Sequence, residues 1–268
     1  MKRVADMLRL DGRVALITGG AGHIGLACAE ALAEAGARIA LSDLNEERTA
    51  ERAAELGRVF GVEAAGFAVD LSRSEETATL IDRVVQRFGR LDVLVNNAAF
   101  VGTSTIAGFA APFQEQSVEA WDAAMRVNLT APFQLAQRAQ AALSAHGHTG
   151  AIINVGSIYG VVAPQWSLYE GTKMANPAAY NASKGGILHL TRYLASVMAP
   201  RVRVNCVSPG GVARGQDPRF VERYTERALL GRMSVEEDLK GAFAYLASDA
   251  SAYVTGQHLL VDGGWTAV

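Results

Sequence analysis

Short apolar runs alternate with helix-length segments from Arg13 to the end of the chain, and this alternation is the strongest constraint on its fold. The runs that we predict to be strands are 14–17, 38–43, 64–70, 91–95, 151–155, 202–207 and 258–261. The segments that we predict to be helices are 24–35, 45–56, 77–88, 118–146 with a kink near Pro132, 178–198 and 235–247. Such alternation is typical of a parallel sheet with helices on both faces. Right-handed crossovers would make it an α/β, doubly wound sheet that binds ligands beyond the carboxyl ends of its strands.

Charge and cysteine content exclude several classes of protein. A net charge of −2 and a pI near 6.2 give no reason to expect nucleic acid or a membrane as a partner. The two cysteines, Cys28 and Cys206, are typical of buried thiols in a reducing compartment. The first ten residues have no signal-peptide core, and the uncharged runs 93–114 and 149–169 contain Asn, Gly, Ser and Pro, which argues against membrane spans. We therefore expect a cytoplasmic protein.

A glycine-rich turn separates the first predicted strand from the first predicted helix. It reads Thr18-Gly19-Gly20-Ala21-Gly22-His23-Ile24-Gly25. Glycines at this position let backbone N–H groups and the helix N-terminus approach a pyrophosphate. The second strand ends in Asp43, which could accept hydrogen bonds from both ribose hydroxyls and would repel a 2′-phosphate. The alternative is that Asp43 only caps the helix that begins near Asn45.

This arrangement resembles the short-chain dehydrogenase/reductase superfamily, whose turn reads Thr-Gly-x-x-x-Gly-x-Gly. Gly19 and Gly25 match that pattern, whereas His23 replaces the middle glycine and Gly22 stands one place earlier. His23 could touch a phosphate or face solvent, and we favour solvent. No Lys or Arg lies in the turn or directly after Asp43, so the resemblance implies NAD as the cofactor, with NADP as the alternative.

Further matches follow in the family's order and extend from Arg13 to Gly264. They are Asp70-Leu71 near the adenine, Asn96-Asn97-Ala98-Ala99 along the cofactor, Ser208-Pro209-Gly210-Gly211 beside the nicotinamide, Thr255-Gly256, and Val261-Asp262-Gly263-Gly264 in the last strand. The resemblance implies a single-domain Rossmann fold over 1–268 with a doubly wound, parallel, seven-stranded sheet. The cofactor-binding residues that it implies are Gly19, Gly22, His23, Ile24, Gly25, Asp43, Asp70, Leu71, Asn97, Ala98, Tyr180, Lys184, Pro209 and Gly210.

A tyrosine and a lysine four residues apart share one face of a helix, and the chain contains this spacing twice. Tyr180 and Lys184 form one pair, and Tyr169 and Lys173 form the other. An ammonium beside a phenol favours the phenolate, lowers its pKa and makes it an acid/base catalyst. Pro177 prevents a helix from continuing through Lys173, whereas a long amphipathic segment follows Tyr180. We therefore assign the chemistry to Tyr180 and Lys184.

The resemblance implies two more catalytic residues. Ser157 follows the fifth strand, where the family's serine binds the substrate oxygen and the tyrosine. Its usual distance to the tyrosine would favour Tyr169, although the helical context favours Tyr180. Asn128 matches the asparagine that holds a water next to the lysine. We expect no metal site, because His146 and His148 lie in a predicted surface turn without cysteines or a carboxylate cluster.

Two segments, 102–117 and 160–179, are longer than the family requires, and both follow carboxyl ends of strands. Gln165, Trp166 and Tyr169 could line the mouth of a substrate site or pack the second segment onto the body. Similar Ser-Ile-Tyr-Gly and Tyr-Glu-Gly-Thr stretches occur in family members assigned to bacterial sugar biosynthesis, which favours a sugar or polyol substrate.

The predicted activity is that of an NAD-dependent oxidoreductase, which interconverts a secondary alcohol and a ketone on a sugar, sugar-acid or polyol substrate. The alternatives are an NADP-dependent carbonyl reductase and a dinucleotide-binding regulator without turnover. The family further implies a homotetramer or homodimer, with the helices that carry Asn128 and Tyr180 at the main interface.

Overall fold

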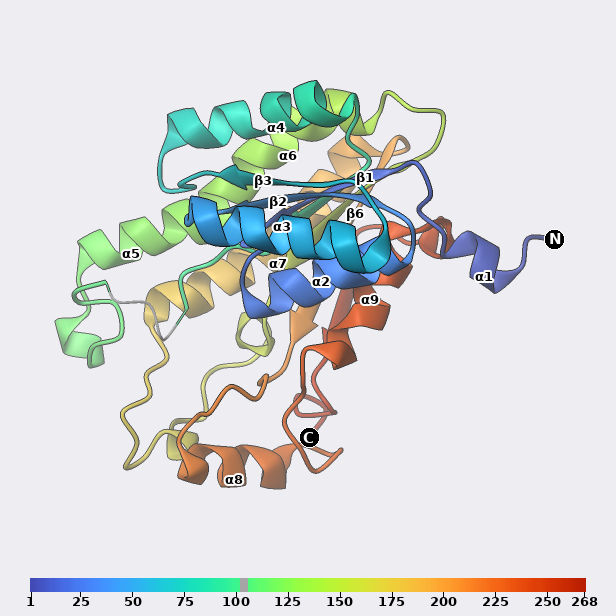
Figure 1. Cartoon of the computed structure of the whole chain (residues 1–268). Coiled ribbons are helices and arrows are strands. Elements are labelled where there is room, and N and C mark those ends of the chain that lie inside the picture. Colours follow the sequence, from blue (N-terminus) through green and yellow to red (C-terminus); the bar gives the residue numbers. More distant parts are fainter. Residues whose placement is uncertain (102–105) are drawn as a thin grey trace.

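The computed structural model describes residues 1–101 and 106–268, and in these ranges one sheet of seven parallel strands forms the centre of the molecule (Figure 1). The strands are β1 (Val14–Thr18), β2 (Arg38–Asp43), β3 (Ala64–Ala68), β4 (Val93–Asn96), β5 (Gly150–Val155), β6 (Val202–Pro209) and β7 (His258–Val261). Their order across the sheet is β3-β2-β1-β4-β5-β6-β7. The predicted α/β, doubly wound, seven-stranded sheet is therefore confirmed.

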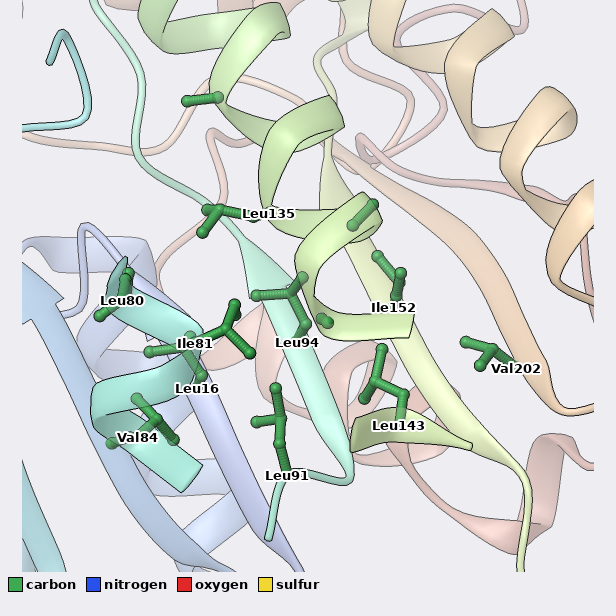
Figure 2. Close-up of a cluster of buried hydrophobic side chains, with 14 of the residues drawn as sticks. Leu16, Leu80, Ile81, Val84, Leu91, Leu94, Leu135, Leu143, Ile152 and Val202 are labelled. Atoms are coloured by element: carbon green, nitrogen blue, oxygen red, sulfur yellow. The ribbon is translucent and has the colours of Figure 1, made fainter. Parts of the chain in front are cut away.

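Helices cover both faces of this sheet, and each face has its own apolar core. One face carries α4 (Ser74–Phe88), α6 (Ala131–Leu143) and α7 (Ala178–Met198). The other carries α2 (His23–Glu34), α3 (Glu46–Phe60) and α9 (Glu237–Ala247). Figure 2 shows the first core, where Leu80 and Ile81 of α4 and Leu135 of α6 lie against strand residues such as Leu94. Strands buried on both faces explain why their sequences are continuously apolar.

The local sequence sets the ends of α3. The side chain of Asn45 accepts a hydrogen bond of 2.8 Å from the N–H of Arg48 and so caps its N-terminus. Gly61 ends the helix with φ +67°, a left-handed conformation that glycine adopts without strain. The predicted end at residue 56 was therefore too early.

The expected helix from Val118 changes its winding in the middle. Helix α5 (Val118–Met125) continues into a π-helical turn, η2 (Arg126–Thr130), and then into α6. Pro132 has no N–H, so the carbonyl of Asn128 lacks its usual α-helical donor. The distortion therefore precedes the proline and includes Asn128.

Several short elements were not predicted. They are α1 (Val4–Met7), α8 (Pro218–Arg227) and the 3₁₀ turns η1 (Phe113–Glu115), η3 (Ile158–Gly160), η4 (Trp166–Leu168) and η5 (Asp249–Ser251). Helix α8 lies apart from the two helical layers (Figure 1). The pair Asp217-Pro218 is a typical start of a helix. Asp217 caps the helix by accepting a hydrogen bond from the N–H of Arg219, and Pro218 occupies the first turn. No helix within the two described ranges is long and apolar enough to cross a bilayer.

Candidate active site

The glycine-rich turn packs tightly between β1 and α2. Gly19 has φ +62°, and a Cβ atom on Gly25 would lie 2.1 Å from the carbonyl oxygen of Gly19. The side chain of Asn97, which follows β4, donates hydrogen bonds of 3.0 Å to the carbonyls of Thr18 and Gly19. Gly22 is the N-cap of α2 and offers no side-chain cap, so this helix end presents backbone N–H groups. The turn therefore suits an anionic ligand.

Asp43 lies at the end of β2 beside this turn. Its two carboxylate oxygens accept hydrogen bonds from the N–H of Ala21 at 3.1 Å and of Leu44 at 2.8 Å. Because Asn45 caps α3, the alternative interpretation of Asp43 as the helix cap is wrong. The Asp43 carboxylate therefore lies directly beside the glycine-rich turn, where the sequence predicts a contact with a ribose.

His23, the first residue of α2, faces solvent as we favoured, with its side chain 61% exposed. Its Nδ1 atom lies 3.3 Å from Oε1 of Glu236, and that oxygen also lies 3.4 Å from Nε of Arg214. The next residue, Ile24, packs against the core shared by α2, α3 and α9. The side chain of His23 therefore faces solvent, whereas that of Ile24 faces the core.

The remaining predicted cofactor residues lie at the same edge of the sheet. Asp70 follows β3 and accepts from the N–H of Ser72 at 2.8 Å, and Leu71 after it is buried. The N–H of Ala98 donates to Oγ1 of Thr18 at 3.2 Å. Pro209 ends β6, and a Cβ on Gly210 would lie 2.7 Å from the hydroxyl of Tyr224. The structure thus brings the predicted set to the carboxyl ends of the strands.

Tyr180 and Ser157 face each other across the end of β5. Tyr180 lies in the first turn of α7, and Ser157 is buried directly after the strand. Burial raises the pKa of the Tyr180 phenol above its ordinary value, and a hydrogen bond with Ser157 acts in the opposite direction. The expected lowering of the Tyr180 pKa by Lys184 is not found in this structure.

Lys184 lies one helical turn after Tyr180 and is buried. Its ammonium donates a hydrogen bond of 2.7 Å to the carbonyl of Val155 and lies 5.6 Å from the centre of the Tyr180 ring. Burial lowers the pKa of Lys184 to about 8. A buried lysine whose proton is easily lost is typical of functional sites.

Asn128 connects two parts of the site through its side chain. Its Oδ1 accepts from the N–H of Phe100 at 2.7 Å, and its Nδ2 donates to the carbonyl of Phe100 at 3.0 Å and to Oγ of Ser183 at 3.1 Å. Ser183 precedes Lys184 on α7. Both amide donors of Asn128 are thereby used to fix the α7 helix against the loop after β4.

The second tyrosine–lysine pair does not lie on a helix. Tyr169 follows the 3₁₀ turn η4, and Lys173 lies in the turn region before α7. The hydroxyl of Tyr169 lies 2.7 Å from that of Tyr159 and accepts from Nδ2 of Asn176 at 3.0 Å. Without helical geometry the spacing of four residues does not align Lys173 with Tyr169.

Helix α8 holds the segment that contains Tyr169. Arg223 donates to the carbonyls of Ser167 at 2.9 Å and Glu170 at 2.7 Å, and Arg227 bonds Gln165. Gln165 and the ring of Tyr169 therefore both contact α8, whereas the side chain of Trp166 remains largely exposed. Part of the other long segment, residues 102–105, lies outside the described residues.

Sequence reasoning missed Tyr159 and Arg223. Tyr159 stands two residues after Ser157, and its N–H donates to the Ser157 hydroxyl at 3.2 Å, but no spacing rule singled it out. Arg223 acts through a contact between segments far apart in the sequence, for which the chain carries no local signal. His148, which we placed in a surface turn, pairs with Asp92 at 2.9 Å, and no cluster of three or more metal-binding side chains is found among the described residues.

Residues 19–266 match the family described as enoyl-(acyl carrier protein) reductase. The chain is 38% identical to 2-(S)-hydroxypropyl-CoM dehydrogenase 3 of Xanthobacter autotrophicus, over 97% of this chain and 99% of that one. It is 37% identical to D-threitol dehydrogenase of Mycolicibacterium smegmatis, over 96% and 94%. The crystal structure of a gluconate 5-dehydrogenase from Burkholderia cenocepacia, in complex with NADP and tartrate, matches with a TM-score of 0.87 and 35% identity, over 99% and 100%.

Proposed function

The chain belongs to the short-chain dehydrogenase/reductase superfamily, and from this we propose that it interconverts a secondary alcohol and a ketone with NAD, through Tyr180, Lys184, Ser157 and Asn128. The observation that carries the proposal is the position of the Tyr180 phenol. It faces Ser157 at the carboxyl end of β5, one helical turn before the buried ammonium of Lys184. A module that only binds a dinucleotide has no need of this combination.

The residues around the turn fit a dinucleotide. The close approach of Gly25 to Gly19 leaves no room for side chains, and the uncapped N-terminus of α2 can bind the pyrophosphate. The carboxylate of Asp43 would hold the adenosine ribose, and Asp70 and Leu71 would lie near the adenine. When bound, the nicotinamide supplies the hydride acceptor or donor.

The chain's own residues would handle the proton and the substrate oxygen. Ser157 would hold that oxygen, and Tyr180 would take the hydroxyl proton during oxidation and return it during reduction. Lys184 would turn from the Val155 carbonyl to the nicotinamide ribose and favour the phenolate of Tyr180. Asn128 would support a water beside Lys184 through its main chain, because its amide donors are already used.

We favour a polyol or sugar-acid substrate. The relatives named above include dehydrogenases of D-threitol and gluconate, and the segments near 102–117 and 160–179 would shape the substrate pocket as insertions. A role in sugar biosynthesis stays a prediction.

We also propose that the protein is cytoplasmic. The thiols of Cys28 and Cys206 are free and buried, as we expect in a reducing compartment.

NAD is the cofactor that we propose because of the Asp43 carboxylate, which would repel the 2′-phosphate of NADP. The solved relative that contains NADP makes an NADP-dependent carbonyl reductase the second candidate. Dissociation constants of NAD and NADP, measured for the wild type and Asp43→Ser, separate the two. We expect tighter binding of NAD by the wild type, and a loss of that preference in the variant.

We also propose a homotetramer or homodimer that uses the helices carrying Asn128 and Tyr180. Exposed apolar side chains lie on α5, α6 and α7, namely Val118, Trp121, Phe133, Tyr193 and Val197. Burying them would remove an apolar surface from water. Sedimentation analysis of the wild type and of Tyr193→Glu would test this assembly.

The central experiment is a substrate screen read as absorbance of the reduced cofactor. Polyols, sugar acids and cyclic alcohols are offered with NAD and with NADP, and the corresponding ketones with the reduced cofactors. Turnover with NAD on a polyol or sugar acid supports the proposal. Binding of NAD without turnover on any alcohol would instead support the non-catalytic regulator.

A further inference from the structure

Residues 161–177, here called the strap, connect η3 to α7 and lie against α8. Arg223 of α8 bonds the main chain of the strap at Ser167 and Glu170, and Arg227 bonds the side chain of Gln165. Arginine donors to main-chain carbonyls form strong, directional hydrogen bonds. The strap therefore has a defined position although it contains little regular structure.

The ring of Tyr169, itself on the strap, packs against α8. It lies 5.9 Å from the ring of Trp166 on the strap and 5.3 Å from that of Phe220 on α8, measured between centroids. From Phe220 the contacts continue through Tyr224 and Trp265 to Tyr159. These ring contacts hold the side chains of both Tyr159 and Tyr169 in place.

Among the residues that the structure describes, the hydroxyls of Tyr159 and Tyr169 leave one proton without an acceptor. They lie 2.7 Å apart, so one phenol donates to the other and uses one of the two protons. Asn176 is a donor to Tyr169 and cannot accept the second proton through that contact. No other hydrogen bond of either hydroxyl is found among residues 1–101 and 106–268.

The residues that carry and contact these two hydroxyls adjoin the candidate active site. Tyr159 is two residues from Ser157 and donates its N–H to the serine hydroxyl. The hydrogen bonds continue from Tyr169 through Asn176 to Asn181, whose amide donates to Asn176 at 2.5 Å. Asn181 directly follows Tyr180 on α7. The network therefore connects the strap to both residues that would hold the reacting oxygen.

We propose that the phenols of Tyr159 and Tyr169 form a subsite that donates a hydrogen bond to a second oxygen of the substrate. The proposal rests on the proposed function, in which Ser157 and Tyr180 hold the first oxygen. A polyol or sugar acid carries such a second oxygen, whereas a cyclic monoalcohol does not. The subsite thus selects polyhydroxylated substrates, because an unpaired donor is left when the second oxygen is missing.

The test compares D-threitol with cyclopentanol in the wild type, Tyr159→Phe and Tyr169→Phe. Each substitution keeps the ring and removes one hydroxyl. We expect the ratio of kcat/KM for D-threitol to that for cyclopentanol to fall about tenfold, mainly through a higher KM for D-threitol. Tyr253→Phe, on a fully exposed side chain, is the matched control and keeps the wild-type ratio. An unchanged ratio in both subsite variants, or equal losses on both substrates, overturns the proposal.

A binding measurement separates this inference from the proposed function. D-threitol, D-mannitol and D-gluconate are titrated into Tyr180→Phe and into the Tyr169→Phe/Tyr180→Phe double variant, with tryptophan fluorescence as the signal. About tenfold weaker binding to the double variant supports the subsite even if the wild type turns over no alcohol. Equal binding to both proteins, or no binding of any of the three compounds, overturns it.

Discussion

The ammonium of Lys184 donates a hydrogen bond of 2.7 Å to the carbonyl of Val155, the last residue of β5. Lys184 is therefore held by the sheet, while the Tyr180 ring lies 5.6 Å away. In this arrangement burial dominates both groups, because it raises the pKa of Tyr180 and lowers the pKa of Lys184 to about 8. Both shifts disfavour the charged pair of phenolate and ammonium in this arrangement.

Tyr180→Phe should remove turnover and leave the fold and cofactor binding intact. The variant keeps the ring and loses the proton that we assign to acid/base catalysis, so kcat should fall by a factor of about 10² to 10⁴. The dissociation constant for NAD, measured by fluorescence, should stay within about twofold of the wild-type value.

The competing assignment is tested in the same assay with Tyr169→Phe. Because Tyr169 lies outside a helix and contacts Tyr159 and Asn176, we expect a loss of at most about tenfold on a polyol. A larger loss in Tyr169→Phe than in Tyr180→Phe would show that our choice between the two tyrosines is wrong.

Lys184→Met should change how stability depends on pH. The folded-state pKa of about 8 lies below the ordinary 10.5, so the unfolded chain binds more protons between these values. The free energy of unfolding of the wild type should therefore rise with pH across this window, by up to about 3 kcal/mol. Below pH 8 the folded protein carries the full cost of a buried ammonium. Methionine does not titrate and fills similar space.

Urea unfolding at a series of pH values from 7 to 10.5 measures this difference. The wild type should gain stability relative to Lys184→Met as the pH rises, and most of the gain should appear above pH 8. Parallel curves for the two proteins would mean that the buried ammonium does not carry the expected cost.

Gly25→Ala should disrupt the cofactor turn, whereas Gly22→Ala should leave the fold intact. The new Cβ would lie 2.1 Å from the carbonyl oxygen of Gly19 in the first variant, but 3.4 Å from the same atom in the second. Relief of the first clash requires a backbone shift that costs about 1–3 kcal/mol. We expect a lower melting temperature and at least about tenfold weaker NADH binding for Gly25→Ala. Equal melting temperatures of the two variants would contradict the geometry of the turn.

The regular elements could be predicted because their physical causes are local. Helix α7 begins and ends where expected, since Pro177 stops a helix before it and apolar spacing continues to Met198. The fully buried strands β4 and β5 stand out as apolar runs. The candidate residues were found through ordered motifs in a family pattern, of which Gly19 and Gly25 have a visible steric reason.

The parts that escaped prediction depend on contacts between distant segments. The strap has no apolar period, and its position follows from Arg223, which is more than fifty residues further along the chain. The hydroxyl pair of Tyr159 and Tyr169 likewise depends on how the strap folds back toward η3. The direction of the Tyr180 pKa shift depends on burial, which spacing alone does not reveal.

Arg223→Gln should release the strap without unfolding the protein. The variant loses charge-assisted hydrogen bonds to the carbonyls of Ser167 and Glu170, so the strap should open more often. Lys173 is exposed on the strap, and trypsin cuts after lysine, so cleavage between Lys173 and Met174 reports the opening. We expect the rate of this cleavage, followed by mass spectrometry, to increase about tenfold. Arg52→Gln, which removes an exposed ion pair with Glu55 on α3, is the matched control and should leave the rate unchanged. If both variants are cut at the wild-type rate, Arg223 does not hold the strap, and its position must come from the other contacts, such as the bond of Arg227 to Gln165 and the aromatic packing of Tyr169.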